Sequence, residues 1–424
     1  MKKFLALIIA LVMALSLVAC GEQKQPETPD VPDDGGDQQQ TATIKVGFIT
    51  LHDENSTYDL NFINAAKEAI ANLGLTENDY ILKTNVPEGQ ECYDAAAELA
   101  DAGCNIIFAD SFGHEPYMIQ AAKDFPNVQF CHSTGTRAHT EGLSNYHNAF
   151  ASIYEGRYLA GIAAGMKLNE MIEAGQFTAD QAKMGYVGAF TYAEVVSGYT
   201  SFYLGAKSVC PTVTMDVTFT GSWYDETLEK EGAQKLIAGG CKLISQHADS
   251  LGAPTACENA GIPNVSYNGS TITAGPNTYI ISSRIDWAPY YEMAIKAVMD
   301  GTEIPADYTG TLSTGSVVLT DLNTAVAAEG TQAAIDAAKA KLESGELHVF
   351  DCSTFTVSGA NVKDTMKVDA DGHLTSYMAD VNTDEAYTGD TEVVHDGYFS
   401  ESEFRSAPYF DLFIDGINTL DTAF

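Results

Sequence analysis

The sequence predicts an α/β protein with two similar lobes, each a parallel sheet flanked by helices, and a small β-rich extension at the C-terminal end. The first reason is that short apolar runs, which suit buried strands, alternate with stretches whose apolar residues recur at helical spacing. The second reason is an internal repeat. The third is length, because 424 residues are too many for one ordinary domain.

The internal repeat contains two similar strand ends. Residues 103–116 read GCNIIFADSFGHEP, and residues 240–254 read GCKLISQHADSLGAP. The two aspartates of these segments, Asp110 and Asp249, are 139 residues apart (249 − 110). Other landmarks repeat at nearly the same offset, which indicates a duplicated lobe. A carboxylate at the equivalent strand end of each half favours a site between the halves.

The first residues are typical of a targeting segment. Residues 1–20 combine two lysines with the apolar run 4–18 and end in Leu-Val-Ala-Cys, which predicts a lipoprotein signal peptide with lipidation at Cys20. An ordinary secretory signal is the alternative. Residues 21–42 are rich in Pro, Gln, Asp and Glu, and we expect a flexible acidic linker. The expected location is the cell membrane, with the chain lipid-anchored on the extracytoplasmic side.

The predicted boundaries follow the repeat. The first lobe is expected at 43–147, the second at 148–284, a return to the first lobe and the hinge at 285–345, and the extension at 346–424. The alternation of strand and helix in each lobe predicts parallel strands joined by right-handed crossovers. In chain order, the first lobe is expected to contain a strand at 45–50, a helix at 58–73, a strand at 80–84, a helix at 92–102, a strand before Asp110, a helix at 117–125 and a strand at 128–131.

The second lobe is expected to open with a long helix at 148–173. Gly161 and Gly165 lie about one turn apart on it, which allows close packing against a neighbouring element. The later elements are expected to be strands at 183–190, 218–221, 280–283 and 315–320, helices at 287–299 and 331–342, and short strands of the extension at 349–357, 366–368 and 392–394.

Charge and motif content exclude several function classes. The 58 acidic and 22 basic residues give a formal net charge of −36, which disfavours binding to nucleic acid. The chain contains no P-loop, HExxH, GxGxxG or nucleophile-elbow motif. Its cysteines include no CxxC pair, so no zinc site is expected. We therefore expect a binding protein and not an enzyme, with no cofactor and no metal.

A ligand site is expected at the C-terminal ends of the strands, where loops and helix N-termini converge. Tyr58 and Trp223 are aromatic residues in such loops, one in each half, and two rings can sandwich a flat ligand. Asp110 and Asp249 either cap the helices that follow them or accept hydrogen bonds from a polar ligand. The loops at these ends are 52–58, 110–114, 132–136, 190–194, 221–224 and 249–253.

A cluster of histidines and aspartates at the same strand ends is the alternative, as a metal-binding or hydrolytic site. The histidines concerned are His52, His114, His132 and His247, and the aspartates are Asp53, Asp110 and Asp249. No two of these histidines have the helical i, i+4 spacing that is common among zinc ligands.

Four segments resemble the basic membrane protein family, the substrate-binding lipoproteins of ABC importers that include purine nucleoside receptors. They are KVGFITLHDENSTYDLNF, AFASIYEGRYLAGIAAG, KMGYVGAF and TFTGSWYDETLEKEGAQKLI. The resemblance covers roughly residues 43–300 and fades after about 345. It implies a periplasmic-binding-protein-like clamshell of type I, whose two lobes close over a ligand before the protein docks on a permease.

The resemblance also implies ligand-binding roles for individual residues. Tyr58 and Trp223 occupy the places of the two aromatic residues that stack on the base. His52 and Asp53 lie in the first loop, where the family usually has an acidic residue that contacts the base. Asn268 and Arg284 stand where an aspartate and a lysine bind the ribose hydroxyls, and Arg for Lys changes the reach and geometry of the cation.

Together these features predict an extracytoplasmic solute-binding lipoprotein of an ABC importer. The expected ligand is small, polar and ring-bearing, with a purine nucleoside as first choice. The expected partners are this ligand, an ABC transporter permease and, through Cys20, the membrane. A surface receptor that senses the ligand without transport is one alternative, and a surface hydrolase is another.

Overall fold

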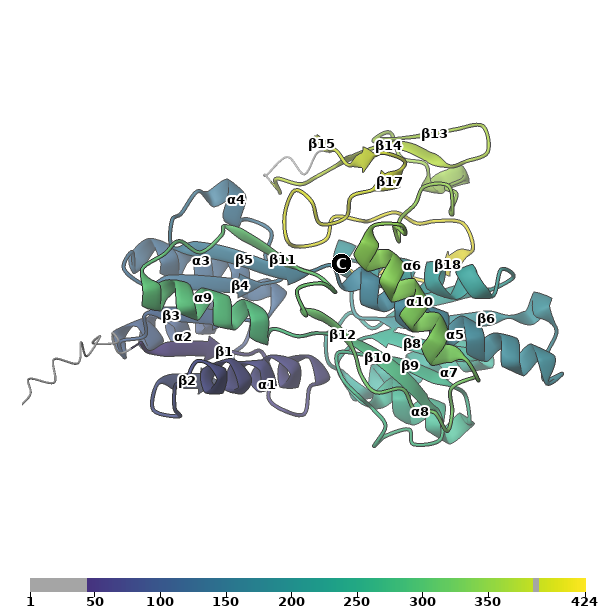
Figure 1. The fold of residues 1–424 in the computed structure, drawn as a ribbon, viewed down its shortest axis with the longest axis horizontal. Helices are drawn as coiled ribbons and strands as arrows, with labels where there is room; N and C mark the ends of the chain where they lie inside the picture. Colours follow the sequence, from purple (N-terminus) through teal and green to yellow (C-terminus); the bar gives the residue numbers. More distant parts are fainter. Residues whose placement is uncertain (1–43, 384–388) are drawn as a thin grey trace, which may run out of the picture. The chain divides into compact units, whose positions relative to one another are not determined.

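The computed structural model describes residues 44–383 and 389–424 (Figure 1). The predicted signal peptide at 1–20, the linker at 21–42 and Cys20 lie outside these residues. Two parallel sheets with flanking helices, and small antiparallel sheets near the C-terminal end, confirm the predicted fold class. Among the described residues, no helix combines the length and the apolar character that a membrane span requires.

The first lobe is built on a six-stranded sheet whose paired strands are all parallel. In spatial order its strands are β11 (Asp307–Gly310), β5 (Tyr146–Ala151), β4 (Gln129–Ser133), β3 (Ile106–Ala109), β1 (Val46–Ile49) and β2 (Tyr80–Lys83). The early helices of this lobe are α1 (Thr57–Asn72), α2 (Gln90–Asp101) and α3 (Glu115–Asp124), followed by the short α4 (Ala138–Glu141).

The second lobe is built on a seven-stranded sheet in which only β12, at one edge, runs antiparallel to its neighbour. In spatial order its strands are β12 (Val317–Leu319), β10 (Tyr279–Ile285), β9 (Asn264–Tyr267), β8 (Leu243–His247), β6 (Lys183–Gly188), β7 (Thr214–Phe219) and β18 (Ile417–Thr419). The helices of this lobe are α5 (Ile153–Glu173), α6 (Ala193–Val209), α7 (Glu226–Ala238) and α8 (Gly252–Ala260).

The helix predicted at 148–173 begins later than expected. Residues 148–151 belong to β5, which pairs with β4 and β11, and α5 starts at Ile153. Every residue of β5 is buried, so its sequence lacks the alternation of polar and apolar residues that marks a half-exposed strand. The predicted lobe boundary at 147 therefore falls inside a strand of the first sheet.

Glycines bring α5 and α6 into close contact, as predicted for Gly161 and Gly165. A Cβ at Gly161 would lie 2.1 Å from the carbonyl oxygen of Phe202, and one at Gly165 would lie 2.5 Å from that of Ala206. Gly205 on α6 has the same role, because a Cβ there would lie 2.0 Å from the carbonyl oxygen of Tyr158. The contact is therefore between the two helix backbones.

The chain passes between the two sheets three times, after β5, after β10 and between β11 and β12. After the second crossing, α9 (Ala288–Asp300) packs against α1 of the first lobe. After the third crossing, α10 (Thr331–Ser344) packs against α5 of the second lobe. The segment predicted at 285–345 as a return to the first lobe thus contributes elements to both lobes.

The C-terminal extension contacts both lobes. Its own strands are β13 (Met366–Val368), β14 (Leu374–Ala379) and β15 (Thr391–Glu392) in one sheet, and β16 (Val394–His395) and β17 (Tyr398–Phe399) in another. It joins the second lobe through β18, which pairs with β7, and through a hydrogen bond from Ser197 to the buried Glu401. It meets the first lobe where Ser406 donates two hydrogen bonds to Asp307, at 2.9 and 2.8 Å.

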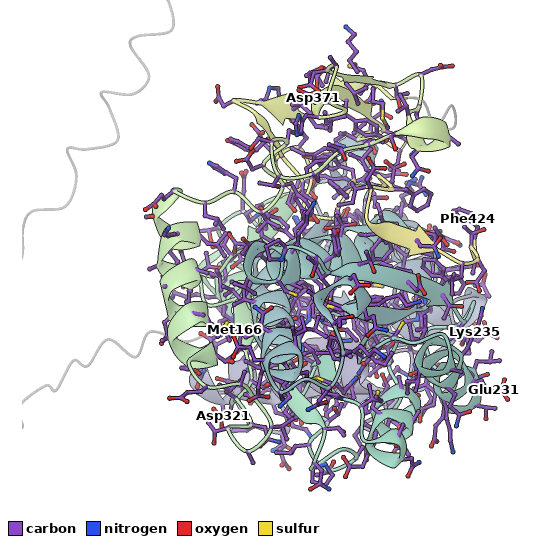
Figure 2. The ribbon with its side chains drawn as sticks, turned by 90° about the vertical axis from the view of Figure 1, so that its right-hand side faces the viewer. Met166, Glu231, Lys235, Asp321, Asp371 and Phe424 are labelled. Atoms are coloured by element: carbon purple, nitrogen blue, oxygen red, sulfur yellow. The ribbon has the colours of Figure 1, made fainter. Side chains whose placement is uncertain are left out.

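The last residues of the chain lie against the second lobe. Asp421 pairs with Lys235 of α7 at 2.9 Å and accepts a hydrogen bond from Thr218 at the end of β7. Figure 2 shows Phe424 and Lys235 on the same side of the molecule, while Asp371 lies in the hairpin between β13 and β14. The sequence pattern predicts short strands in this region, but not that β18 completes the sheet of the second lobe.

Candidate functional site

A cavity lies between the lobes at the C-terminal ends of the strands. Residues of both lobes line it, and each comes from a loop, a strand end or the first turn of a helix. The first lobe contributes Leu51, Tyr58, Asp59, Ser111, Phe112 and Thr134, and the second contributes Glu194, Trp223, His247, Asp249 and Asn268. The duplicated lobes therefore face each other across one cavity, as the repeat predicts.

The cavity is narrow in this arrangement of the lobes. Its volume is about 20 Å³, which is room for one or two water molecules. The lobes touch beside it, because the backbone N–H of Thr57 and its hydroxyl both donate to the carbonyl oxygen of Asp249, at 3.0 and 3.1 Å. A ligand with a ring system therefore enters only if the lining residues move apart.

Aromatic rings form much of the wall. The hydroxyl of Tyr58 donates to the carbonyl oxygen of Asp110 at 2.7 Å, which fixes the ring at the start of α1. The ring of Trp223 lies edge-on to Phe190, with centroids 5.1 Å apart. Phe112 also lines the cavity but was not predicted as a site residue. In the structure this residue is 38% exposed, which is unusual for a phenylalanine. The two aromatics predicted from the sequence, Tyr58 and Trp223, do line the same cavity.

Asp110 lies behind this wall and does not line the cavity. Its Oδ1 accepts a hydrogen bond from the backbone N–H of Leu51 at 3.1 Å, and its Oδ2 has no hydrogen-bond partner among the described residues. Burial, followed by the nearby carboxylate of Asp59, raises the pKa of Asp110 well above its usual value. The residue holds the loop after β1 and is not the N-cap of the next helical turn, which is Ser111.

Asp249 lines the cavity from the second lobe. Its Oδ1 accepts a hydrogen bond from the Asn268 side chain at 3.2 Å, and its backbone N–H donates to Trp223 at 3.0 Å. Burial, followed by the charges of Asp59 and Glu229, raises its pKa well above the usual value. Leu251 precedes α8 as its N-cap, so Asp249 is not the cap of that helix either. Asp249 is therefore a residue of the cavity wall and not a helix cap.

Sequence reasoning missed four polar residues of the lining, Asp59, Ser111, Thr134 and Glu194, and named His247 only for the alternative metal or hydrolytic site. Asp59 lies in the first turn of α1, where an acidic residue is explained by the helix dipole alone. It accepts hydrogen bonds from the His52 backbone N–H at 2.7 Å and the Ser56 hydroxyl at 2.5 Å. Glu194 lies in the first turn of α6, and His247 Nε2 is 3.3 Å from its carboxylate. Burial lowers the pKa of His247.

Besides Asp110, three of the residues predicted to bind ligand do not line the cavity. His52 places its ring against Tyr224, with centroids 5.5 Å apart, and Asp53 accepts hydrogen bonds from Asn55 at 3.1 and 2.8 Å. The guanidinium of Arg284 donates to Asn61 at 3.2 Å and to Asp286 at 3.3 Å. His52 Nδ1 also lies 3.4 Å from the carboxylate of Asp59, which lines the cavity. Arg284 lines a separate hollow beside α1.

The buried histidines of the first lobe do not form a metal cluster in the described part of the chain. His114 Nε2 contacts the carbonyl oxygen of Val86 at 2.9 Å, and His132 Nε2 contacts that of Ser111 at 2.6 Å. Within residues 44–383 and 389–424, the group with metal-ligand geometry is Asp369, Asp371 and His373, which lies in the extension and not at the cavity. Among the described residues that line the cavity, none is a lysine or an arginine.

The family model described as "ABC transporter substrate-binding protein PnrA-like" matches residues 48–349. This range includes every residue that lines the cavity and leaves most of the extension unmatched.

Individual solute-binding proteins are also similar to this chain in sequence. A purine-binding protein of Brucella abortus is 34% identical over 271 residues, which cover 63% of this chain and 72% of that protein. A protein of Haloferax volcanii, named as a glucose-binding component of an ABC transporter, is 31% identical over 61% of this chain and 62% of its own length. An ABC transporter nucleoside-binding protein of Lactococcus lactis is 23% identical over 59% of this chain and 67% of that protein.

Solved structures share the fold at low sequence identity. A solute-binding protein of an ABC transporter system from Aeropyrum pernix superposes with a TM-score of 0.60 at 18% identity, over 76% of this chain and 95% of that one. One from Conexibacter woesei gives a TM-score of 0.57 at 22% identity, over 72% of this chain and 98% of that one.

Proposed function

Since the chain belongs to the family of PnrA-like substrate-binding proteins of ABC transporters, we propose that it binds a purine nucleoside, or a closely related purine compound, between its lobes. The same membership establishes a solute-binding component of a transporter and not an enzyme. The observation that carries the proposal is the pairing of Tyr58 and Trp223, which come from opposite lobes and line one cavity.

The chemistry of the cavity suits an uncharged base. Two aromatic rings can stack on its faces, and each stack contributes about 1–3 kcal/mol. Asp249 and Asn268 supply hydrogen-bonding groups from the second lobe, and Asp59 supplies a carboxylate from the first. The absence of lysine and arginine from the described lining disfavours phosphorylated ligands. The purine-binding and nucleoside-binding relatives support the same ligand class.

The proposed contact set is therefore narrower than the one predicted from the sequence. It keeps Tyr58, Trp223, Asp249 and Asn268 as direct contacts and gives Asp110 a supporting role behind the wall. His52, Asp53 and Arg284 are left out of it, because their side chains are held by other partners.

The identity of the ligand is tested by recovering it from the purified protein. The purified protein is denatured, and the released small molecules are identified by mass spectrometry. Thermal-shift measurements then compare adenosine, guanosine, inosine, adenine and hypoxanthine with uridine, AMP and D-glucose. We expect one or more of the purine compounds to be recovered unchanged and to raise the melting temperature. A thermal shift with D-glucose alone would replace the proposed ligand by a sugar.

We propose further that the protein is anchored by lipid at Cys20 and delivers its ligand to an ABC permease. The signal sequence and the family support both steps. In cells, Cys20→Ala is expected to release the protein from the membrane fraction, and deletion of the gene is expected to abolish purine uptake. Membrane association that persists in the variant would contradict the anchor, and unchanged uptake would favour a sensor that takes no part in transport.

A further inference from the structure

Thr134 has a backbone conformation that threonine rarely adopts. It is the first residue after β4, its φ is 72°, and it is 3% exposed. A β-branched residue in this left-handed region is strained, and such strain persists only where the surroundings impose it. Strain of this kind is concentrated at ligand sites.

The neighbouring residues hold this conformation firmly. The backbone N–H of Thr134 donates to Ala149 on β5 at 2.9 Å. Two further backbone N–H groups of the loop, of Thr136 and Arg137, both donate to the Glu115 carboxylate, at 2.8 and 2.9 Å. Gly135 fits between them only because it lacks a Cβ, which would lie 2.0 Å from the Asn148 side chain. The conformation of this loop is therefore fixed by contacts within the first lobe.

The duplication places Asn268 at the equivalent position of the second lobe. Asn268 is the first residue after β9, its φ is 67°, and it is 3% exposed. Its backbone N–H donates to Ser283 on the adjacent strand β10 at 3.0 Å, as Thr134 donates to Ala149 on β5. The two donors, Thr134 and Asn268, are 134 residues apart (268 − 134), and so are their two acceptors, Ala149 and Ser283 (283 − 149). Each lobe therefore places a polar residue with a positive φ at the cavity, and the strain falls on the β-branched Thr134.

The hydroxyl of Thr134 has no partner in the described structure. Its Oγ1 is enclosed by protein and makes no hydrogen bond to any described residue. Leaving a buried polar group unpaired costs free energy, so native proteins rarely do so without a reason. The side chain lines the cavity between the lobes, where a bound ligand can supply the missing partner.

The position of Thr134 indicates which part of the ligand it meets. Thr134, Phe112 and Glu194 also line a larger chamber of about 1170 Å³ between the lobes and the C-terminal extension, whereas Tyr58 and Trp223 line the narrow cavity alone. At its other end the cavity adjoins, through Asn268, a smaller hollow of about 310 Å³. A base stacked between Tyr58 and Trp223 has the larger space for its substituent at the end where Thr134 lies. The substituent of a nucleoside is its sugar.

We propose that the Thr134 hydroxyl hydrogen-bonds to a sugar hydroxyl of the bound nucleoside, opposite its counterpart Asn268. The inference rests on the proposed function, and it adds a contact that distinguishes a nucleoside from a free base. A threonine hydroxyl both donates and accepts, which suits a sugar hydroxyl.

The test is isothermal titration calorimetry of the protein, which measures the Kd for adenosine, guanosine and inosine and for the bases adenine and hypoxanthine. Thr134→Val keeps the shape and the β-branch and removes only the hydroxyl. We expect it to raise the Kd for the nucleoside that the wild type binds by about 5- to 10-fold and to leave the Kd for its base unchanged. Thr134→Ser is expected to restore most of the nucleoside affinity.

Thr200 provides a matched control. It is also fully buried with an unpartnered Oγ1, but it lies on α6 and does not line the cavity. Thr200→Val is expected to leave every Kd unchanged. Equal nucleoside affinity in Thr134→Val and the wild type, or an equal loss for base and nucleoside, would overturn the sugar contact. Absence of purine binding by the wild type would instead overturn the proposed function, and this inference with it.

Discussion

Asp110 and Asp249 are buried carboxyl groups, and burial changes what they can do. The pKa of each is raised well above its usual value, first by burial and then by the Asp59 carboxylate. A protonated carboxyl group donates a hydrogen bond, whereas a carboxylate only accepts. Asp249 can therefore offer a donor to a ligand, which its position after a strand does not reveal.

The raised pKa of Asp110 makes stability depend on pH. The folded chain binds this proton more tightly than the unfolded chain, so the contribution of Asp110 to stability falls as pH rises above about 3.8. Asp110→Asn mimics the protonated acid and does not titrate, so the variant does not lose stability at this position as pH rises. We expect the variant to gain stability over the wild type as pH rises from about 4 to 8, measured as the free energy of unfolding in urea at each pH.

Asp53 is the control for this prediction, because hydrogen bonds from Asn55 lower its pKa. The contribution of its carboxylate to stability is present above about pH 3.8 and is lost at lower pH, so Asp53→Asn is expected to be less stable than the wild type by a nearly constant amount from about pH 4 to 8. A constant difference between Asp110→Asn and the wild type at all pH values would contradict a raised pKa in the folded state.

Single site residues could be predicted where the local sequence marks them, and not where only the tertiary structure does. Tyr58 and Trp223 were found because aromatics in strand-end loops are visible in the sequence. Thr134 could not be found, because a positive φ and an unpartnered hydroxyl exist only once neighbouring strands fix the loop. Arg284 was misplaced with respect to the cavity because its partner Asn61 lies far away in the sequence and meets it only in the folded chain.

The packing of α5 against α6 is a backbone contact made by small residues. Gly161 and Gly165 on α5 face α6, and Gly205 on α6 faces α5. The sequence predicts this contact, because glycines one turn apart share a helix face. It does not predict where α5 begins, since β5 is buried throughout and has no period that separates it from a buried helix.

Gly161→Ala is expected to destabilise the protein by about 2–3 kcal/mol. The new Cβ would lie 2.1 Å from a backbone oxygen of α6, which a side-chain rotation cannot relieve. The free energy of unfolding in urea measures the effect.

Gly232→Ala on α7 is the matched control. Its Cβ would meet nothing nearer than 3.4 Å, so the higher helix propensity of alanine should leave stability unchanged or raise it by up to about 1 kcal/mol. An equal loss of stability in both variants would show that the effect comes from glycine replacement in general and not from the contact between α5 and α6.

The duplicated lobes account for most of the molecule and were predictable because the repeat is written in the sequence. The extension was predictable only as short strands. Its place is set by distant contacts, such as β18 beside β7 and Ser406 beside Asp307, which no local pattern specifies. Because it touches both lobes, it also forms a wall of the chamber next to the ligand cavity.

Closure of the lobes is expected to accompany binding. The cavity of about 20 Å³ is too small to admit a purine compound, so the free protein must sample arrangements with the lobes further apart. Small-angle X-ray scattering is expected to show a smaller radius of gyration when the ligand is added. An unchanged radius under conditions where calorimetry shows saturation would contradict closure.

The most direct test of the account is the affinity of Trp223→Ala for the purine nucleoside that the wild type binds, measured by isothermal titration calorimetry. Loss of one stacking ring is expected to raise the Kd by about 5- to 150-fold. Trp223→Phe should retain most of the affinity, and Tyr224→Ala, whose ring lies against His52 outside the cavity, should retain all of it. Undiminished affinity in Trp223→Ala would contradict binding of the base between the two lobes.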